Sequence, residues 1–284
     1  MAKLASRLAI ALLFILFALW QYYGSAVENP VTGEQQHIQL SIEDEITLGR
    51  EARDQLATEY GGFYANTRVQ NYIAAVGDRL VEQSVATNAP YPFEFHVLDD
   101  PQTINAFALP GGQVFITTAL LGAMTNEAQV AGVLGHEIAH VVARHGAEHV
   151  AKQQLGQFLF IAIAAAAGGD DQTTEQAEIL AKVVNGLISL KYSREDETES
   201  DYWGFEFMTE AGYTPQGIVD VMEILQAAGG GGIPEFLSSH PDPGNRIRSL
   251  EEMIAVRYPD GIPPQLEAGT DRFAPIQNRL PGGN

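Results

Sequence analysis

The amino-acid sequence predicts an α+β fold that is mainly helical and contains one small antiparallel sheet. Apolar residues recur with the period of a helix over much of the chain, as at Val69, Ile73 and Leu80. Two segments, 91–100 and 111–121, instead either alternate between apolar and polar residues or are continuously apolar. Both are rich in β-forming residues, which predicts strands. With 284 residues, 45% of them hydrophobic, the chain is long enough to bury a substantial core.

The N-terminal stretch, residues 1–26, is predicted to be either a signal peptide or a membrane anchor. Two basic residues precede an apolar run at 8–20, and small residues at 24–26 offer a cleavage site. Aromatic residues near the end of the run suit a membrane interface, so residues 8–23 could also remain as an uncleaved anchor. Both alternatives place the rest of the chain outside the cytoplasm.

Three further regions follow from composition. Residues 27–40 form a short polar linker, and residues 41–258 carry the periodic patterns of a single globular domain. Residues 259–284 form a tail rich in Pro and Gly, which we expect to be loosely ordered.

Capping signals place the helices of the globular domain. Ser41 precedes a helical pattern with acidic residues in its first turn, as a helix N-terminus favours. Asn126 begins a long apolar helix that is expected to continue towards Leu155. Ser193 is expected to cap a further helix that runs through Met208.

Charge and cysteine content exclude several classes of function. Against 16 Lys and Arg stand 36 Asp and Glu, a formal net charge of −20, so nucleic acid is not an expected partner. The chain contains no cysteine, which excludes disulfides, thiolate metal ligands and a cysteine nucleophile. A metal ion would have to be bound by histidines and carboxylates.

The predicted long helix contains the sequence HEIAH at residues 136–140. Residues four apart on a helix face the same way about 6 Å from each other, so His136 and His140 can bind one zinc ion. Glu137 lies about 100° further round the helix, where it can act as a general base on a water at the metal. The sequence therefore predicts a catalytic site with one Zn²⁺ per chain.

A catalytic zinc site needs a third protein ligand. Residue 146 is Gly146, which excludes the extended motif that has a third histidine at this position. His145 and His149 would face away from the metal on a continuous helix, so we expect them to make structural contacts on its other face.

An acidic segment supplies the best candidates for the third ligand. Glu195, Glu197 and Glu199 are all carboxylates, but only Glu197 has Asp201 one turn further on and facing the same way. We therefore expect Glu197 to bind the metal and Asp201 to accept a hydrogen bond from His136, which would fix that imidazole's orientation.

With these residues, the sequence resembles the M48 family of zinc metallopeptidases, and in particular its bacterial periplasmic, chaperone-protease-like branch. The resemblance covers residues 41–256 and rests on four motifs: NAFALPGG at 105–112, HEIAH at 136–140, YSREDETESD at 192–201 and HPDPGNR at 240–246. It implies a gluzincin-type metallopeptidase domain in the periplasm or on the periplasmic face of a bacterial membrane.

The resemblance also implies roles for further residues. Asn105, Ala106, Phe107 and Ala108 would bind an extended substrate backbone by strand addition. His240 would lie beside the metal, where it could stabilise the oxyanion or occupy the open position and hold the enzyme latent. Arg246 would position carboxylates beside the site.

The implied function is a zinc endopeptidase of the cell envelope that hydrolyses unfolded or misassembled envelope proteins. Residues 8–23 would allow it to associate with the membrane. The alternative is a zinc-stabilised periplasmic chaperone or binding module with little peptidase activity. Glu137 argues against that alternative, because a purely structural zinc site needs no general base.

Overall fold

The computed structural model describes residues 2–167, 191–228, 234–241 and 243–282, and it is a mainly helical α+β fold, as predicted. Its helices are α1 (Ala2–Gly24), α2 (Ile42–Glu59), α3 (Thr67–Glu82), the 3-10 helix η1 (Val85–Asn88), α4 (Thr118–Ala123), α5 (Glu127–Val142), α6 (His145–Ala167), α8 (Arg194–Glu210), α9 (Gln216–Ala228), α10 (Glu235–Ser239), α11 (Pro243–Arg257) and α12 (Thr270–Gln277). Its strands are β1 (Ala26–Glu28), β2 (Gln35–His37), β3 (Glu94–Leu98), β4 (Ala106–Leu109) and β5 (Gln113–Thr117).

The predicted sheet exists, but it is mixed rather than antiparallel. Its order is β3-β5-β4, with β3 parallel and β4 antiparallel to the central, buried strand β5. Gly111 and Gly112 turn the chain from β4 into β5 at φ 81° and 101°, values that favour glycine. Strand β4 takes one side of β5, and β3 pairs on the other side. Strand β4 therefore lies at an edge of the sheet.

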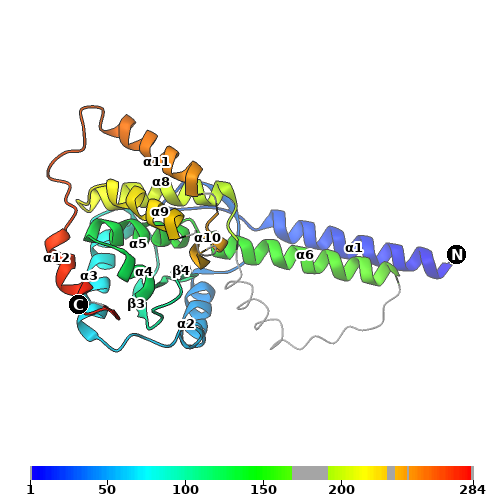
Figure 1. The fold of residues 1–284 in the computed structure, drawn as a ribbon. Helices are drawn as coiled ribbons and strands as arrows, with labels where there is room; N and C mark the ends of the chain where they lie inside the picture. Colours follow the sequence, from blue (N-terminus) through cyan, green and yellow to red (C-terminus); the bar gives the residue numbers. More distant parts are fainter. Residues whose placement is uncertain (1, 168–190, 229–233, 242, 283–284) are drawn as a thin grey trace.

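Helix α5 forms the centre of the domain (Figure 1), and every one of its residues is buried. Helices α3, α8 and α9 pack around it together with the sheet. It approaches α8 closely where Gly135 meets Gly204, since a side chain at Gly204 would come within 2.9 Å of the His136 backbone nitrogen. This close approach brings the acidic side chains of α8 next to the histidines of α5.

The long helix predicted from Asn126 towards Leu155 is wrong, because the helix is interrupted. α5 ends at Val142, and α6 begins at His145 after Arg144 adopts φ 58°, a left-handed conformation that non-glycine residues rarely take. The side chain of Arg144 pairs with the buried carboxylate of Glu45 and donates to the Leu40 carbonyl at 3.1 Å. These contacts with residues far away in the sequence stabilise the interruption.

The expectation of a loosely ordered C-terminal tail is also wrong. It contains α12, whose Phe273 and Ile276 are buried in the main hydrophobic core, followed by the equally buried Leu280. Arg272 donates to Glu127 at 2.8 Å, which ties α12 to the start of α5. The high content of Pro and Gly in this segment predicts disorder, but its few apolar residues pack on the core of the domain and order it.

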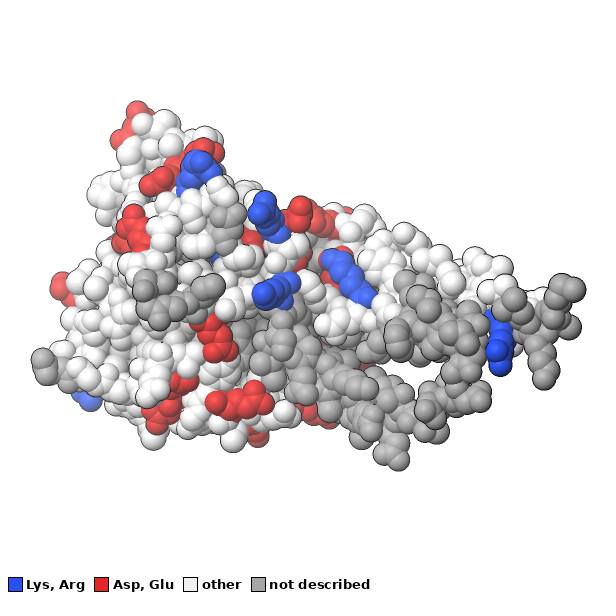
Figure 2. Space-filling model, turned by 45° about the vertical axis from the view of Figure 1, so that its right-hand side comes forward, with Lys and Arg blue, Asp and Glu red and all other residues white. Residues whose placement is uncertain are grey.

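Helices α1 and α6 pack side by side and project from the domain as an arm (Figure 1). On the face shown in Figure 2, charged side chains are concentrated on the domain and the base of the arm, and the described surface of the arm is mostly uncharged. The large apolar side chains that α1 exposes are Leu8, Ile10, Leu12, Leu13, Phe14, Leu16, Phe17, Trp20 and Tyr23. Within the described chain, residues 5–24 of α1 form the one helix long and apolar enough to cross a membrane.

Candidate metal centre

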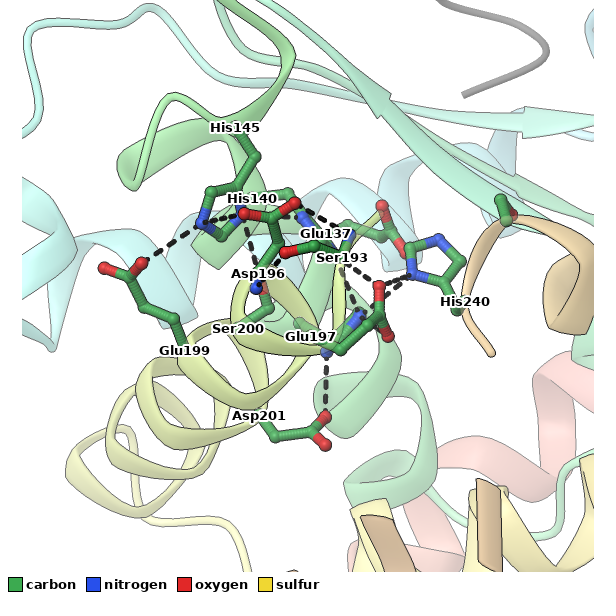
Figure 3. A network of polar contacts seen from close by, with 12 residues as sticks. Glu137, His140, His145, Ser193, Asp196, Glu197, Glu199, Ser200, Asp201 and His240 are labelled. Carbon is green, nitrogen blue, oxygen red and sulfur yellow. Dashed lines mark hydrogen bonds and ion pairs between the residues drawn. The ribbon is translucent and has the colours of Figure 1, made fainter. Parts of the chain in front are cut away.

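Three separate elements bring four potential metal ligands together. α5 supplies His136 and His140, α8 supplies Glu197, and the end of α10 supplies His240. One donor atom from each of these buried residues lies within 4.8 Å of every other donor atom. Figure 3 shows that Glu197, on α8, and His240, which follows α10, both point towards the side chains of α5.

The two α5 imidazoles face each other through their Nε2 atoms, which are 3.1 Å apart. Glu197 approaches with one oxygen 3.6 Å from His136 Nε2 and the other 3.5 Å from His140 Nε2. Two imidazole nitrogens and a carboxylate are the ligand set of many catalytic zinc sites. The residues that we expected to bind the metal are therefore brought together around one point.

Unpartnered polar atoms support the presence of a bound group at this point. Both carboxylate oxygens of Glu137 and the His240 Nε2 atom are buried and have no hydrogen-bond partner. Burying polar atoms without partners costs free energy, so native proteins generally pair them. A metal ion with an associated water would satisfy these atoms, and the residues present therefore fit such an ion.

Glu137 is fully buried beside the cluster without belonging to it. Burial raises the pKa of Glu137 above its usual value, which brings a carboxylate closer to the range of a general base at neutral pH. His240 Nε2 lies 3.6 Å from Glu137 Oε1.

Asp201 and Arg246 lie next to the cluster and contact two of its members, His136 and Glu197. Asp201 Oδ1 lies 3.0 Å from His136 Nδ1, the nitrogen that points away from the cluster, as we expected. Arg246 donates to the two oxygens of Asp201 at 2.8 and 2.6 Å and pairs with Glu197 at 2.6 Å. Burial alone would raise the pKa of Asp201, but the Arg246 charge, together with hydrogen bonds from Arg246 and His136, outweighs burial and holds that pKa below its usual value. Asp201 therefore stays an anionic acceptor for His136.

We expect Asp201→Asn to weaken zinc affinity about 10- to 100-fold, the usual effect of changing a partner that orients a metal ligand. The substitution preserves the size of the side chain but removes the charge that faces His136 and Arg246. Competition with a chromophoric chelator measures the change. Unaltered affinity would show that the carboxylate only balances the charge of Arg246.

His145 has a role that its position in the sequence did not predict. Because the helix is interrupted at Arg144, His145 Nδ1 lies 2.9 Å from His140 Nδ1 instead of facing away, so the expectation of purely structural contacts on the helix's other face is wrong for this residue. His149 does face away, and its Nε2 lies 3.2 Å from Asp196. The ring of Tyr192, also missed, stacks on His140 at 3.8 Å. The sequence does not predict that the helix is interrupted at position 144, since this residue is neither proline nor glycine.

The expected substrate-binding segment coincides with β4 and the residue before it. Asn105 and Ala106 are buried, and the Asn105 side chain donates to the Tyr60 hydroxyl at 3.1 Å, so it serves the interior of the domain. Phe107 and Ala108 are half-buried. A small pocket lined by Ala108, Leu109, His140 and Tyr192, among others, opens between this edge strand and the metal ligands.

Comparisons with known proteins agree with this geometry. The sequence model of peptidase family M48 matches residues 67–254. The chain is 33% identical over 241 residues to the mitochondrial metalloendopeptidase OMA1 of Schizosaccharomyces pombe, which covers 82% of this chain and 68% of that protein. It is 30% identical over 270 residues to the mitochondrial metalloendopeptidase OMA1 of Saccharomyces cerevisiae, and this match covers 88% of this chain and 75% of that protein.

A bacterial relative reaches a similar identity over a smaller share of its own length. The chain is 33% identical over 235 residues to the β-barrel assembly-enhancing protease of Escherichia coli, covering 78% of this chain and 46% of that protein. The chain therefore spans about half the length of this relative.

Proposed function

The chain belongs to peptidase family M48 and is a metalloendopeptidase, and on this premise we propose that it is a zinc enzyme of the bacterial cell envelope that hydrolyses unfolded or misassembled proteins. The observation that carries the proposal is the buried, unpartnered carboxylate of Glu137 next to the donors of His136, His140 and Glu197. A chaperone with a structural zinc site would have no use for such a carboxylate.

In this proposal the chain's own residues divide the work of peptide hydrolysis. His136, His140 and Glu197 hold zinc, which when bound polarises the scissile carbonyl and the attacking water. Glu137 accepts the proton of that water on a carboxylate oxygen and then delivers it to the nitrogen of the leaving amine. His240 and Arg246 keep Glu197 anionic, because their charges hold the pKa of Glu197 well below its usual value despite burial.

The edge strand supports a preference for extended chains. Backbone groups on the outer edge of β4 can pair with an extended peptide, as in other cases of strand addition. Asn105 and Ala106 would hold the strand in place, and Phe107 and Ala108 would meet the substrate. Folded proteins rarely offer an unpaired extended segment, so unfolded proteins are the substrates that this edge favours.

For the location we propose that α1 remains attached as a membrane anchor. Ala11 and Ala18 of α1 are buried against the rest of the chain, and β1 begins at Ala26, the last of the small residues expected at a cleavage site. A cut there would remove a helix that packs on α6. The similar proteins are named as mitochondrial metalloendopeptidases and, in bacteria, as β-barrel assembly-enhancing proteases. The two basic residues ahead of the apolar run of α1 form a pattern typical of an export signal, which favours the bacterial envelope.

Digestion of a permanently unfolded protein tests the proposed function. The full-length chain in detergent micelles should cleave casein and should leave a folded, protease-resistant protein of similar size intact. Suppression of aggregation without cleavage would favour the chaperone alternative.

We further propose that His240 holds the resting enzyme latent. Its Nδ1 lies 2.9 Å from Glu197 Oε1 and 3.2 Å from His136 Nε2, so it competes for the position that a substrate or water needs. Phe236 stacks on its ring at 4.3 Å and supports this orientation. Four consecutive glycines at 229–232 precede His240 in the sequence and, because glycine adopts many backbone conformations, are expected to let the His240 loop move. They lie outside the described residues.

His240→Ala is expected to raise basal casein cleavage at saturating zinc. If the latched state contains about nine in ten molecules, the increase is about tenfold. Zinc content measured on the same samples controls for a change in metal loading. A lower rate at equal zinc content would instead assign His240 to stabilisation of the oxyanion, and an equal rate would contradict both roles.

A further inference from the structure

His145 contacts a metal ligand although the sequence spacing turns the two residues apart. Five positions on an uninterrupted helix correspond to about 140° of rotation, which would direct His145 away from His140. The left-handed conformation of Arg144 reverses this direction, and the two Nδ1 atoms lie 2.9 Å apart. His145 is 2% exposed, so this contact is made away from solvent.

The orientation of His140 fixes the direction of the hydrogen bond. Its Nε2 faces the other ligands, 3.1 Å from His136 Nε2 and 3.5 Å from Glu197 Oε1. A neutral imidazole that binds a metal through Nε2 carries its proton on Nδ1. His140 therefore donates through Nδ1, and His145 Nδ1 accepts.

The chain of hydrogen bonds continues from His145 to the carboxylate of Glu199. Since His145 accepts through Nδ1, its own proton is on Nε2, which lies 3.2 Å from Glu199 Oε2. Figure 3 shows His145 between His140 and Glu199, with Ser200 Oγ 3.3 Å from the same Nδ1. We infer that His145 and Glu199 are positioning residues that orient His140 for metal binding, an inference that rests on the proposed metal site.

The arrangement gives each ligating histidine its own outer partner on α8. His136 faces Asp201 directly at 3.0 Å, whereas His140 reaches Glu199 through His145. Such outer acceptors fix the tautomer and ring orientation of metal-bound histidines and raise their basicity. Glu199 thereby acts in metal binding although it is not itself a ligand.

Zinc affinity of the full-length protein tests the inference. We expect His145→Ala to weaken the zinc dissociation constant, measured by chelator competition, about 10- to 100-fold. The matched control is His149→Ala, which removes the next histidine of α6 and its contact with Asp196 but touches no ligating histidine. This control should bind zinc as tightly as the unaltered chain.

Two further variants separate positioning from a loss of packing. His145→Asn places an amide oxygen near the position of Nδ1, so it should bind zinc more tightly than His145→Ala. Glu199→Ala removes a side chain from α8 rather than α6, one that is 17% exposed, and should also weaken zinc binding. The melting temperature of the metal-free proteins reports any loss of stability that is unrelated to zinc.

The outcomes distinguish this inference from the proposed function, since zinc binding is measured without any substrate. Unchanged affinity in both His145→Ala and Glu199→Ala overturns the inference while leaving the peptidase assignment intact. Equal losses in His145→Ala, His145→Asn and His149→Ala also overturn it, because they indicate a general effect of disturbing α6. If the chain binds zinc as described but cleaves no casein, the proposed function fails and the positioning role stands.

Discussion

Glu137→Gln is expected to abolish peptide hydrolysis while leaving zinc in place. The substitution removes the group that takes a proton from the attacking water, and general bases of this kind contribute about 10²- to 10⁴-fold to the rate. The three metal ligands are untouched, so about one zinc per chain should remain bound. Casein cleavage and zinc content, measured on the same preparation, check both parts.

The retained metal distinguishes this result from unfolding. Glutamine has nearly the shape of glutamate, and the site already buries Glu137 completely, so the fold should tolerate the change. Casein cleavage at the normal rate would remove Glu137 from the mechanism. Loss of zinc along with activity would mean that Glu137 is a ligand.

Glu197→Ala should reduce bound zinc from about one per chain to a small fraction, because a site with two imidazoles alone lacks the third ligand that catalytic zinc requires. Loss of the carboxylate also leaves Arg246 and His240 with one anionic partner fewer, which we expect to destabilise the metal-free protein. Elemental analysis after gel filtration measures the zinc.

The neighbouring carboxylates provide a control for Glu197→Ala. Glu195 lies on the same helix and is exposed, so Glu195→Ala should keep its zinc and its activity. Glu199→Ala should fall between the two, with weaker binding but no complete loss. The choice of Glu197 as ligand is wrong if Glu195→Ala loses zinc and Glu197→Ala does not.

The sequence was sufficient for the parts of the site that depend on local geometry. His136, Glu137 and His140 share one helix, so their relative directions follow from its period. Glu197 and Asp201 are likewise one turn apart on α8. Their distances to the two nitrogens of His136 agree with the expectation that Glu197 faces the metal position and Asp201 accepts from His136. The helix that carries them begins at the capping box of Ser193 and Asp196.

The parts that were missed depend on contacts between distant residues. Arg144 leaves the helical conformation because Glu45, 99 positions earlier in the chain, offers a buried partner. Without that contact, nothing at positions 143–146 predicts that His145 turns back towards His140. The order of the sheet and the packing of Phe273 are also decided by which surfaces are available in the folded domain.

Removal and restoration of the metal in the unaltered, full-length protein test the central claim most directly. The protein is dialysed against a chelator, its zinc content is measured, and casein cleavage is followed before and after zinc is returned. We predict that cleavage disappears with the metal and returns when about one zinc per chain is bound. Continued cleavage by zinc-free protein, or no cleavage by the fully loaded protein, would contradict the claim.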